Sequence, residues 1–284
     1  MKFGLFGINT GPCADPDTMR NVAVAAENAG FESLWTAEHV VLPDPQVPPS
    51  PAPPLAAFIH PFTALSFLAA VTDKILLGTG ITLIAQRNAV VLAKETASVD
   101  QLSKGRLLFG IGAGYLTQEF EALGIEFSER GARTDEYIDA IRELWTSENP
   151  AFEGQFVKYG GIQSRPLAYQ NGGPPVIVGG TSKAAYRRAL QKGQGWYGFA
   201  LDLDASEQSI GALRSLAETT SRDASLGELE ISITPGVRLT DEVVKQFEEL
   251  GVSRLILLPT GQNEADLLAY IDQIASDYLS GTSD

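Results

Sequence analysis

The residue best suited to proton transfer is a histidine that follows a short apolar segment. His39 comes directly after Trp35-Thr36-Ala37-Glu38, whereas the second histidine, His60, stands beside Pro61 at an expected helix start, where a structural role is favoured. Imidazole ionises closer to neutral pH than other side chains, so it can give or take a proton at physiological pH. His39 is therefore the candidate general acid or base.

A second group of residues has the composition of an anion site. Gly179-Gly180-Thr181-Ser182 joins an expected strand to an expected helix, and Lys183, Arg187 and Arg188 follow. A helix start offers unpaired N–H groups and a favourable dipole, and the two hydroxyl side chains add donors. An ordinary capped helix would account for the hydroxyl residues alone. We favour a phosphate site, because barrels commonly bind phosphate at this position.

Glycines cluster at three expected strand ends, namely Gly78-Thr79-Gly80, Gly110-Ile111-Gly112-Ala113-Gly114 and Gly179-Gly180. Glycine weakens a strand, so such clusters favour the close approach of a large flat ligand, with tight packing and turn geometry as the alternative. The middle cluster matches a dinucleotide-binding fingerprint poorly, because Tyr115 stands beside the required third glycine position and three strands precede it.

Bringing these residues to one rim requires parallel strands that alternate with helices. Short apolar segments, several of them apolar on both faces, predict eight strands. Their expected bounds are Phe3 to Ile8, Ser33 to Ala37, Ile75 to Leu83, Leu107 to Gly112, Pro175 to Val178, Trp196 to Ala200, Leu229 to Thr234 and Leu255 to Leu258.

Helical patterns lie between these strands, as where Val243, Phe247 and Leu250 recur at i, i+4 and i+7. Eight strand-helix repeats without a linker predict an α/β fold, a (β/α)8 TIM barrel that forms a single domain over residues 1–284. A doubly wound sheet is the alternative. The expected helices are Asp17 to Ala29, Pro61 to Val71, Ala89 to Leu102, Glu129 to Thr146, Ser182 to Lys192, Ala205 to Thr220, Asp241 to Leu250 and Glu264 to Leu279.

Two segments interrupt the repeat. Seven prolines lie between Pro43 and Pro54, after the second strand, so an extended surface loop is expected there, either a passive insertion or part of a lid. The second insertion, residues 151–165, precedes the fifth strand. Its segment 152–159 alternates around Gly154 and predicts a small hairpin.

Charge and composition argue against several classes of protein. The chain has 35 acidic and 21 basic residues and a formal net charge of −14, which disfavours nucleic acid and membrane surfaces as partners. The single cysteine, Cys13, and the two histidines argue against a disulfide framework and a metal site. No apolar segment approaches the roughly 18 residues of a membrane span and no signal peptide is evident, so a cytoplasmic protein is expected.

Six segments together resemble one family. They are GFESLWTAEH (30–39), HPFTALSFLAA (60–70), ILLGTGI (75–81), GRLLFGIGAG (105–114), ERGARTDE (129–136) and PPVIVGG (174–180). In this order they are similar to the luciferase-like monooxygenase superfamily, and most closely to its oxidoreductases that depend on coenzyme F420, a deazaflavin. The resemblance covers about residues 1–200, and the remainder agrees only in its strand-helix repeat.

The resemblance implies a cofactor that lies across the strand ends. It implies a bulge in the third strand with a cis peptide between Gly80 and Ile81. Glu38 and His39 correspond to the family's pair after the second strand, with His39 near the site of hydride transfer and Glu38 setting its orientation or ionisation. The implied cofactor contacts are Thr79, Gly80, Ile81, Gly112, Ala113, Gly114, Tyr115, Gly179, Gly180, Thr181 and Ser182.

The chain also departs from parts of this family. Tyr115 stands where the sugar-phosphate dehydrogenases have a glutamate, and aromatic residues at 196–200 replace their phosphate-binding lysine. An apolar or carbonyl substrate is therefore expected in place of a phosphorylated sugar. We expect hydride transfer between coenzyme F420 and a small organic substrate, by a homodimer as is common among relatives. A monooxygenase that uses flavin mononucleotide (FMN) and a non-catalytic cofactor-binding homologue are the alternatives.

Overall fold

Eight parallel strands close into a barrel in the computed structural model, which describes residues 1–279. The pairing of β3 with β5, with Leu77 opposite Leu107, completes the ring. A doubly wound sheet keeps two open edges, so this pairing excludes that alternative and the predicted barrel is confirmed. The barrel strands are β1 (Lys2–Phe6), β2 (Ser33–Thr36), β3 (Leu76–Thr79), β5 (Leu107–Gly112), β8 (Val176–Gly179), β9 (Gly195–Leu201), β10 (Glu230–Pro235) and β11 (Arg254–Leu257).

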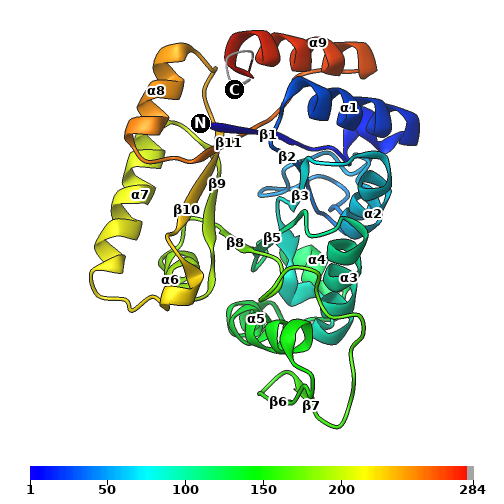
Figure 1. Ribbon diagram of the computed structural model, residues 1–284, viewed down its shortest axis with the longest axis vertical. Coiled ribbons are helices and arrows are strands. Elements are labelled where there is room, and N and C mark those ends of the chain that lie inside the picture. Colours follow the sequence, from blue (N-terminus) through cyan, green and yellow to red (C-terminus); the bar gives the residue numbers. More distant parts are fainter. Residues whose placement is uncertain (280–284) are drawn as a thin grey trace.

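One longer helix follows each barrel strand and lies outside the ring (Figure 1). These helices are α1 (Pro16–Ala29), α2 (Pro61–Val71), α3 (Ala89–Leu102), α5 (Arg130–Thr146), α6 (Lys183–Lys192), α7 (Leu203–Ala217), α8 (Asp241–Glu249) and α9 (Glu264–Ile274). The shorter helical segments are α4 (Thr117–Ala122), η1 (Gly11–Ala14), η2 (Ile84–Gln86), η3 (Phe127–Glu129), η4 (Ala224–Leu226) and a π-helical turn, η5 (Ala275–Leu279).

Local signals set the ends of these helices, as α1 illustrates. The Asp15 side chain accepts a hydrogen bond of 2.9 Å from the amide of Thr18, and Pro16 occupies the first helical position. Gly30 ends the helix with a φ of +91°, a conformation that costs glycine little.

The third strand is interrupted where a continuous strand from Ile75 to Leu83 was expected. β3 ends at Thr79, a cis peptide joins Gly80 to Ile81, and β4 (Thr82–Leu83) then pairs with β5. The cis peptide lies where the family resemblance implied it. Gly80 and Ile81 leave the ladder at this point and reach the rim of the barrel.

Two apolar clusters stabilise the barrel. The larger lies between strands and helices, and the smaller fills the barrel interior with side chains from six strands. Within the interior, a Cβ on Gly78 would lie 2.5 Å from the Trp35 ring, so only glycine fits beneath this indole. The interior side chains are Phe6, Trp35, Leu108, Ile177, Tyr197 and Ile256.

An arginine closes the barrel at the end opposite the rim. Arg254, the first residue of β11, is 2% exposed, and its guanidinium donates to Glu32 at 2.6 and 2.8 Å and to Ser232 at 3.0 Å. It also pairs with Glu230 and lies 5.7 Å from the centre of the Trp35 ring. Because a buried charge needs such partners, these contacts fix the register of the strands that carry them.

Both expected insertions are present. Residues 43–54 form neither helix nor strand. In the second insertion, β6 (Phe152–Glu153) and β7 (Lys158–Tyr159) pair antiparallel, which confirms the hairpin, and Figure 1 shows it projecting beyond α5. Among the helices of residues 1–279, none has the length and apolar character to cross a membrane.

Candidate functional site

A cavity of about 400 Å³ opens at the carboxyl ends of the strands, the end of the barrel opposite Arg254. Its wall is mostly aromatic and apolar, and none of the described residues that line it is a lysine or an arginine. The lining residues are Phe6, Thr10, Ala37, Glu38, His39, Pro51, Ala52, Phe58, Gly80, Ile81, Leu83, Tyr115, Gly179, Gly180, Thr181, Tyr197 and Phe199.

Most of the residues expected at the site reach this cavity. Its wall includes the expected residues Glu38, His39, Gly80, Ile81, Tyr115, Gly179, Gly180 and Thr181. The remaining expected contacts lie behind the wall or beside it, and these are Thr79, Gly112, Ala113, Gly114 and Ser182. Their contact with a cofactor stays a prediction.

Several strand glycines make room for the protein itself, which favours tight packing, the alternative to ligand approach, at Gly110, Gly112 and Gly179. A Cβ on Gly112 would lie 2.1 Å from the Ile81 side chain, and one on Gly179 would lie 2.8 Å from it. A Cβ on Gly110 would lie 1.8 Å from the carbonyl oxygen of Thr79, whose hydroxyl donates to the Gly110 carbonyl at 2.6 Å. Tight packing around the bulge of the third strand thus requires these glycines, and Ile81 itself forms part of the cavity wall.

Glu38 is a buried carboxylate held by an arginine. Its Oε1 accepts from Arg87, and its Oε2 accepts from the amide of Leu83 at 3.3 Å. Burial raises the pKa of Glu38, and the charge and hydrogen bond of Arg87 oppose this shift. Arg87 also contacts Nε2 of His60 at 2.9 Å, which gives His60 the structural role expected of it.

The acidic partner of His39 is Glu119, which corrects the expectation that Glu38 would orient this ring. Nδ1 of His39 lies 3.2 Å from Oε1 of Glu119, a carboxylate with 1% of its side chain exposed. That oxygen also accepts from the amide of Val40 at 2.9 Å. The distance between Nδ1 and Oε1 is short enough for an ion pair, but the direction of the contact does not suit a hydrogen bond. No other described residue pairs with Nδ1. On the opposite side of the ring, Nε2 lies 3.5 Å from the Tyr115 hydroxyl.

This arrangement favours one tautomer of neutral His39. A lone pair on Nδ1 would face the negative oxygen of Glu119, whereas a proton there is attracted to it. The proton therefore belongs on Nδ1, and Nε2 presents its lone pair toward Tyr115. A histidine held in this way can accept a proton at Nε2 while the carboxylate stabilises the resulting imidazolium.

Glu119 was not identified from the sequence because helix α4, which carries it, was not predicted. Residues 113–128 separate the fourth expected strand from the next expected helix and have no predicted element. Leu116, Phe120 and Leu123 recur there at i, i+4 and i+7, a helical signal in a segment of about two turns. Arg87 carried no such signal, because it lies in a loop between η2 and α3.

The expected anion site lies where Gly180 turns into α6. Gly180 has a φ of +108°, and the Ser182 hydroxyl caps the helix by accepting from the amide of Ala185 at 3.2 Å. Thr181 is exposed and lines the cavity. Arg188 contributes less than expected, because its side chain is buried and paired with Asp135 at 2.7 Å.

Aromatic side chains complete the wall. The Tyr197 hydroxyl lies 2.6 Å from the Thr234 hydroxyl, and burial raises the pKa of Tyr197 so that it stays neutral. The ring of Phe199 is half exposed and lies 5.1 Å from the ring of Phe6. Pro51 brings the proline-rich loop to the cavity, so this loop forms part of the wall.

The sequence is similar to a known protein family and to several individual proteins. A family model described as luciferase-like monooxygenase matches residues 1–254. An uncharacterised protein of Mycobacterium tuberculosis is 26% identical over 259 residues, 88% of this chain and 90% of that protein. The 5,10-methylenetetrahydromethanopterin reductase of Methanolobus tindarius is 30% identical over 174 residues, 61% of this chain and 47% of the reductase. An FMNH2-dependent dimethylsulfone monooxygenase of Pseudomonas fluorescens is 27% identical over 215 residues, 74% and 56% of the two chains.

Solved structures share the fold. The monooxygenase RslO1 from Streptomyces bottropensis superposes with a TM-score of 0.79 at 21% identity, and the match covers 100% of both chains. An F420-dependent secondary alcohol dehydrogenase, solved with an F420-acetone adduct, gives 0.78 at 18% identity over 99% of both chains. The coenzyme F420-dependent tetrahydromethanopterin reductase from Methanopyrus kandleri gives 0.77 at 15% identity, again over 99% of both chains.

Proposed function

The chain belongs to the luciferase-like monooxygenase family, and from this premise we propose that it transfers a hydride between coenzyme F420 and a small organic substrate. The observation that carries the proposal is the arrangement of His39 and Tyr115 in the wall of a largely apolar cavity, with the buried carboxylate of Glu119 against the His39 ring. Two structural neighbours are named as F420-dependent enzymes, which supports this cofactor over FMN.

The rim of the cavity offers groups that would hold the cofactor. Gly180 leaves the backbone bare at the start of α6, and Thr181 offers a hydroxyl there, so this turn would hold the cofactor phosphate. Gly80 and Ile81 would support the ring from the third strand. When bound, the deazaflavin supplies or accepts the hydride.

His39 would move the proton that accompanies the hydride. When a hydroxyl substrate is oxidised, Nε2 accepts the hydroxyl proton while the substrate carbon loses its hydride. In the reverse direction the imidazolium returns that proton to the oxygen of a carbonyl as the carbon gains the hydride, so charge and atoms balance. Glu119 stabilises the imidazolium and holds the ring, and Tyr115 orients the substrate oxygen beside Nε2.

The cavity wall favours an uncharged substrate. No lysine or arginine among the described residues lines it, so a phosphate or carboxylate on the substrate would lack a charged partner. Phe58, Phe199 and Pro51 present apolar surface instead. We therefore propose a carbonyl compound or its alcohol with an apolar body as the substrate.

Fluorescence titration of the purified protein tests the cofactor. Coenzyme F420 and FMN are added separately, and quenching of each is followed to saturation. We expect F420 to bind more tightly. Equal or reversed affinities would favour the FMN-dependent alternative, to which the Pseudomonas relative is named as belonging. Binding without turnover of any carbonyl compound would favour the non-catalytic alternative. The homodimer stays a prediction that sedimentation equilibrium tests.

A further inference from the structure

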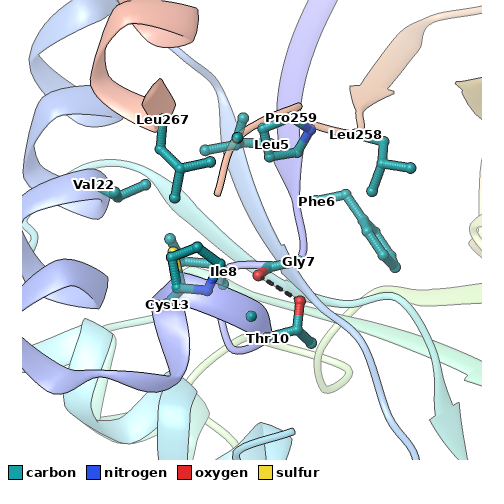
Figure 2. A pocket seen from close by; sticks show the side chains of 13 residues that line it. Leu5, Phe6, Gly7, Ile8, Thr10, Cys13, Val22, Leu258, Pro259 and Leu267 are labelled. Atoms are coloured by element: carbon teal, nitrogen blue, oxygen red, sulfur yellow. Dashed lines mark hydrogen bonds between the residues drawn. The ribbon is translucent and has the colours of Figure 1, made fainter. Parts of the chain in front are cut away.

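A second, smaller cavity lies beside the first at the carboxyl ends of β1 and β11. It measures about 160 Å³. Figure 2 shows Leu267 of α9 and Val22 of α1 on one side of it, with Phe6 and Leu258 on the other. The remaining lining residues are Leu5, Gly7, Ile8, Thr10, Gly11, Pro12, Cys13, Pro259 and Gly261.

The chemistry of this cavity suits an uncharged apolar group. The Thr10 hydroxyl already donates to the carbonyl oxygen of Gly7 at 3.1 Å, as Figure 2 shows. The buried thiol of Cys13 stays neutral, because burial raises its pKa to about 12. Enclosed apolar cavities of about 150 Å³ bind benzene or xenon, and this cavity, although partly open, has a similar volume, so it has the size for a single aromatic ring or a short alkyl chain.

Two residues connect this cavity with the larger one. Phe6 and Thr10 line both cavities. Phe6 is 8% exposed, and on the other side its ring contacts the half-exposed ring of Phe199. The two cavities are therefore adjacent, with Phe6 and Thr10 at their shared boundary.

We propose that the smaller cavity is a subsite for the apolar end of the substrate, a phenyl ring or a short alkyl chain. The reacting carbon and oxygen of the same molecule would lie beside His39. This inference rests on the proposed function for its substrate, but the affinity of the cavity for apolar groups does not depend on any cofactor. It predicts that the enzyme prefers ketones or alcohols that carry a phenyl or short alkyl tail.

Xenon identifies the subsite without cofactor or substrate. Crystals of the full chain under xenon pressure should show xenon among Leu5, Val22 and Leu267. Val22→Phe should fill the cavity and abolish this density, whereas Val22→Ala should retain it. Val99→Phe is the matched control, because Val99 is also a helical valine with 1% exposure and lines neither cavity. It should keep xenon in place even if it destabilises the protein equally.

Turnover then tests the assignment to substrate. With reduced F420 bound as the hydride donor, Val22→Phe should lower kcat/KM about 10- to 200-fold for a methyl ketone that bears a phenyl tail, with little change for acetone. Cys13→Leu is a second filling variant, used if Val22→Phe does not fold. Absence of xenon from the wild-type cavity overturns the subsite while leaving the proposed function intact. Equal losses for both ketones overturn the tail assignment. If F420 does not bind at all, the proposed function fails and the substrate assignment fails with it, whatever xenon shows.

Discussion

Replacing Glu119 by leucine should move the proton of neutral His39 from Nδ1 to Nε2. In the wild type, Nδ1 faces the carboxylate at 3.2 Å, and Nε2 faces the Tyr115 hydroxyl, which can accept a proton as readily as donate one. Without the carboxylate, a proton on Nδ1 has no acceptor among the described residues, whereas a proton on Nε2 has Tyr115. The tautomer should therefore invert.

The structure sets the size of the accompanying losses. The tautomer change gives the His39 proton a new acceptor, so the main costs to folding fall on two other donors. The Val40 amide loses its acceptor at 2.9 Å, and the buried Nε2 of Gln86 loses its acceptor at 3.4 Å. An unpaired buried donor costs about 1–3 kcal/mol, so the loss of both acceptors should lower the unfolding free energy by about 2–4 kcal/mol. Turnover of the folded variant should also fall, by about 10²- to 10⁴-fold, because a proton on Nε2 prevents proton acceptance there.

The assay is ¹⁵N–¹H correlation of the imidazole rings, which report the protonated nitrogen directly. The chain has only two histidines, and His60 is an internal reference because its Nε2 faces Arg87, which can only donate. Glu119→Gln retains an acceptor oxygen toward Val40 and His39. Its new amide group faces Nε2 of Gln86, and a turn of the Gln86 amide would present Oε1, which has no partner among the described residues, as the acceptor. This variant should keep the wild-type tautomer.

Glu121→Leu controls for the loss of a carboxylate from the same helix, because Glu121 is exposed. It should leave both rings unchanged. An unaltered His39 tautomer in folded Glu119→Leu would refute the reasoning, since some other group would then be holding the proton on Nδ1. Inversion in Glu121→Leu as well would show that charge near α4, and not contact with the ring, decides the tautomer.

Four further perturbations test the site and the barrel. His39→Asn should lower turnover by about 10²- to 10⁴-fold at saturating cofactor while a titration shows cofactor affinity within a few fold, and near-normal turnover would remove its role in proton transfer. Thr181→Val should weaken F420 binding by about 10- to 100-fold with an unchanged melting temperature, because its hydroxyl caps no helix; unchanged affinity would place the phosphate elsewhere. Cys13 should react with iodoacetamide at pH 8 only after unfolding, because its thiol is buried and its pKa is raised to about 12, so rapid labelling of the native protein would contradict the structure. Arg254→Leu should cost about 3 kcal/mol of unfolding free energy at pH 7 by urea titration. Partial burial acts to raise the pKa of Glu230, but the charges of Arg254 and a neighbouring lysine outweigh it, so the pKa lies below its ordinary value. The stabilisation is therefore present above the ordinary glutamate pKa and is lost as pH falls. The cost of Arg254→Leu should shrink toward pH 3, and a cost independent of pH would contradict the ion pair.

The sequence by itself determined the barrel and the rim of the site. The strand-helix repeat is a local pattern, and apolar segments such as Leu255-Ile256-Leu257 signal buried strands wherever they occur. Once the strands are parallel, residues that follow them share one rim, so His39, Gly180 and Thr181 could be placed at one end of the barrel without coordinates. The hairpin at 152–159 was predictable for the same reason, because its two strands are neighbours along the chain.

Only the tertiary structure decided which rim residues touch. Glu38 is adjacent to His39 in sequence and lines the same cavity, but its carboxylate pairs with Arg87, whereas the His39 ring lies against Glu119. From the sequence, Gly112 is expected to contact a ligand. In the structure, the bulge of the third strand places the Ile81 side chain against Gly112. Such contacts depend on the bulge and on the stagger between neighbouring strands. In a closed barrel this stagger is set by the pairing of all eight strands, so no short segment of sequence determines it.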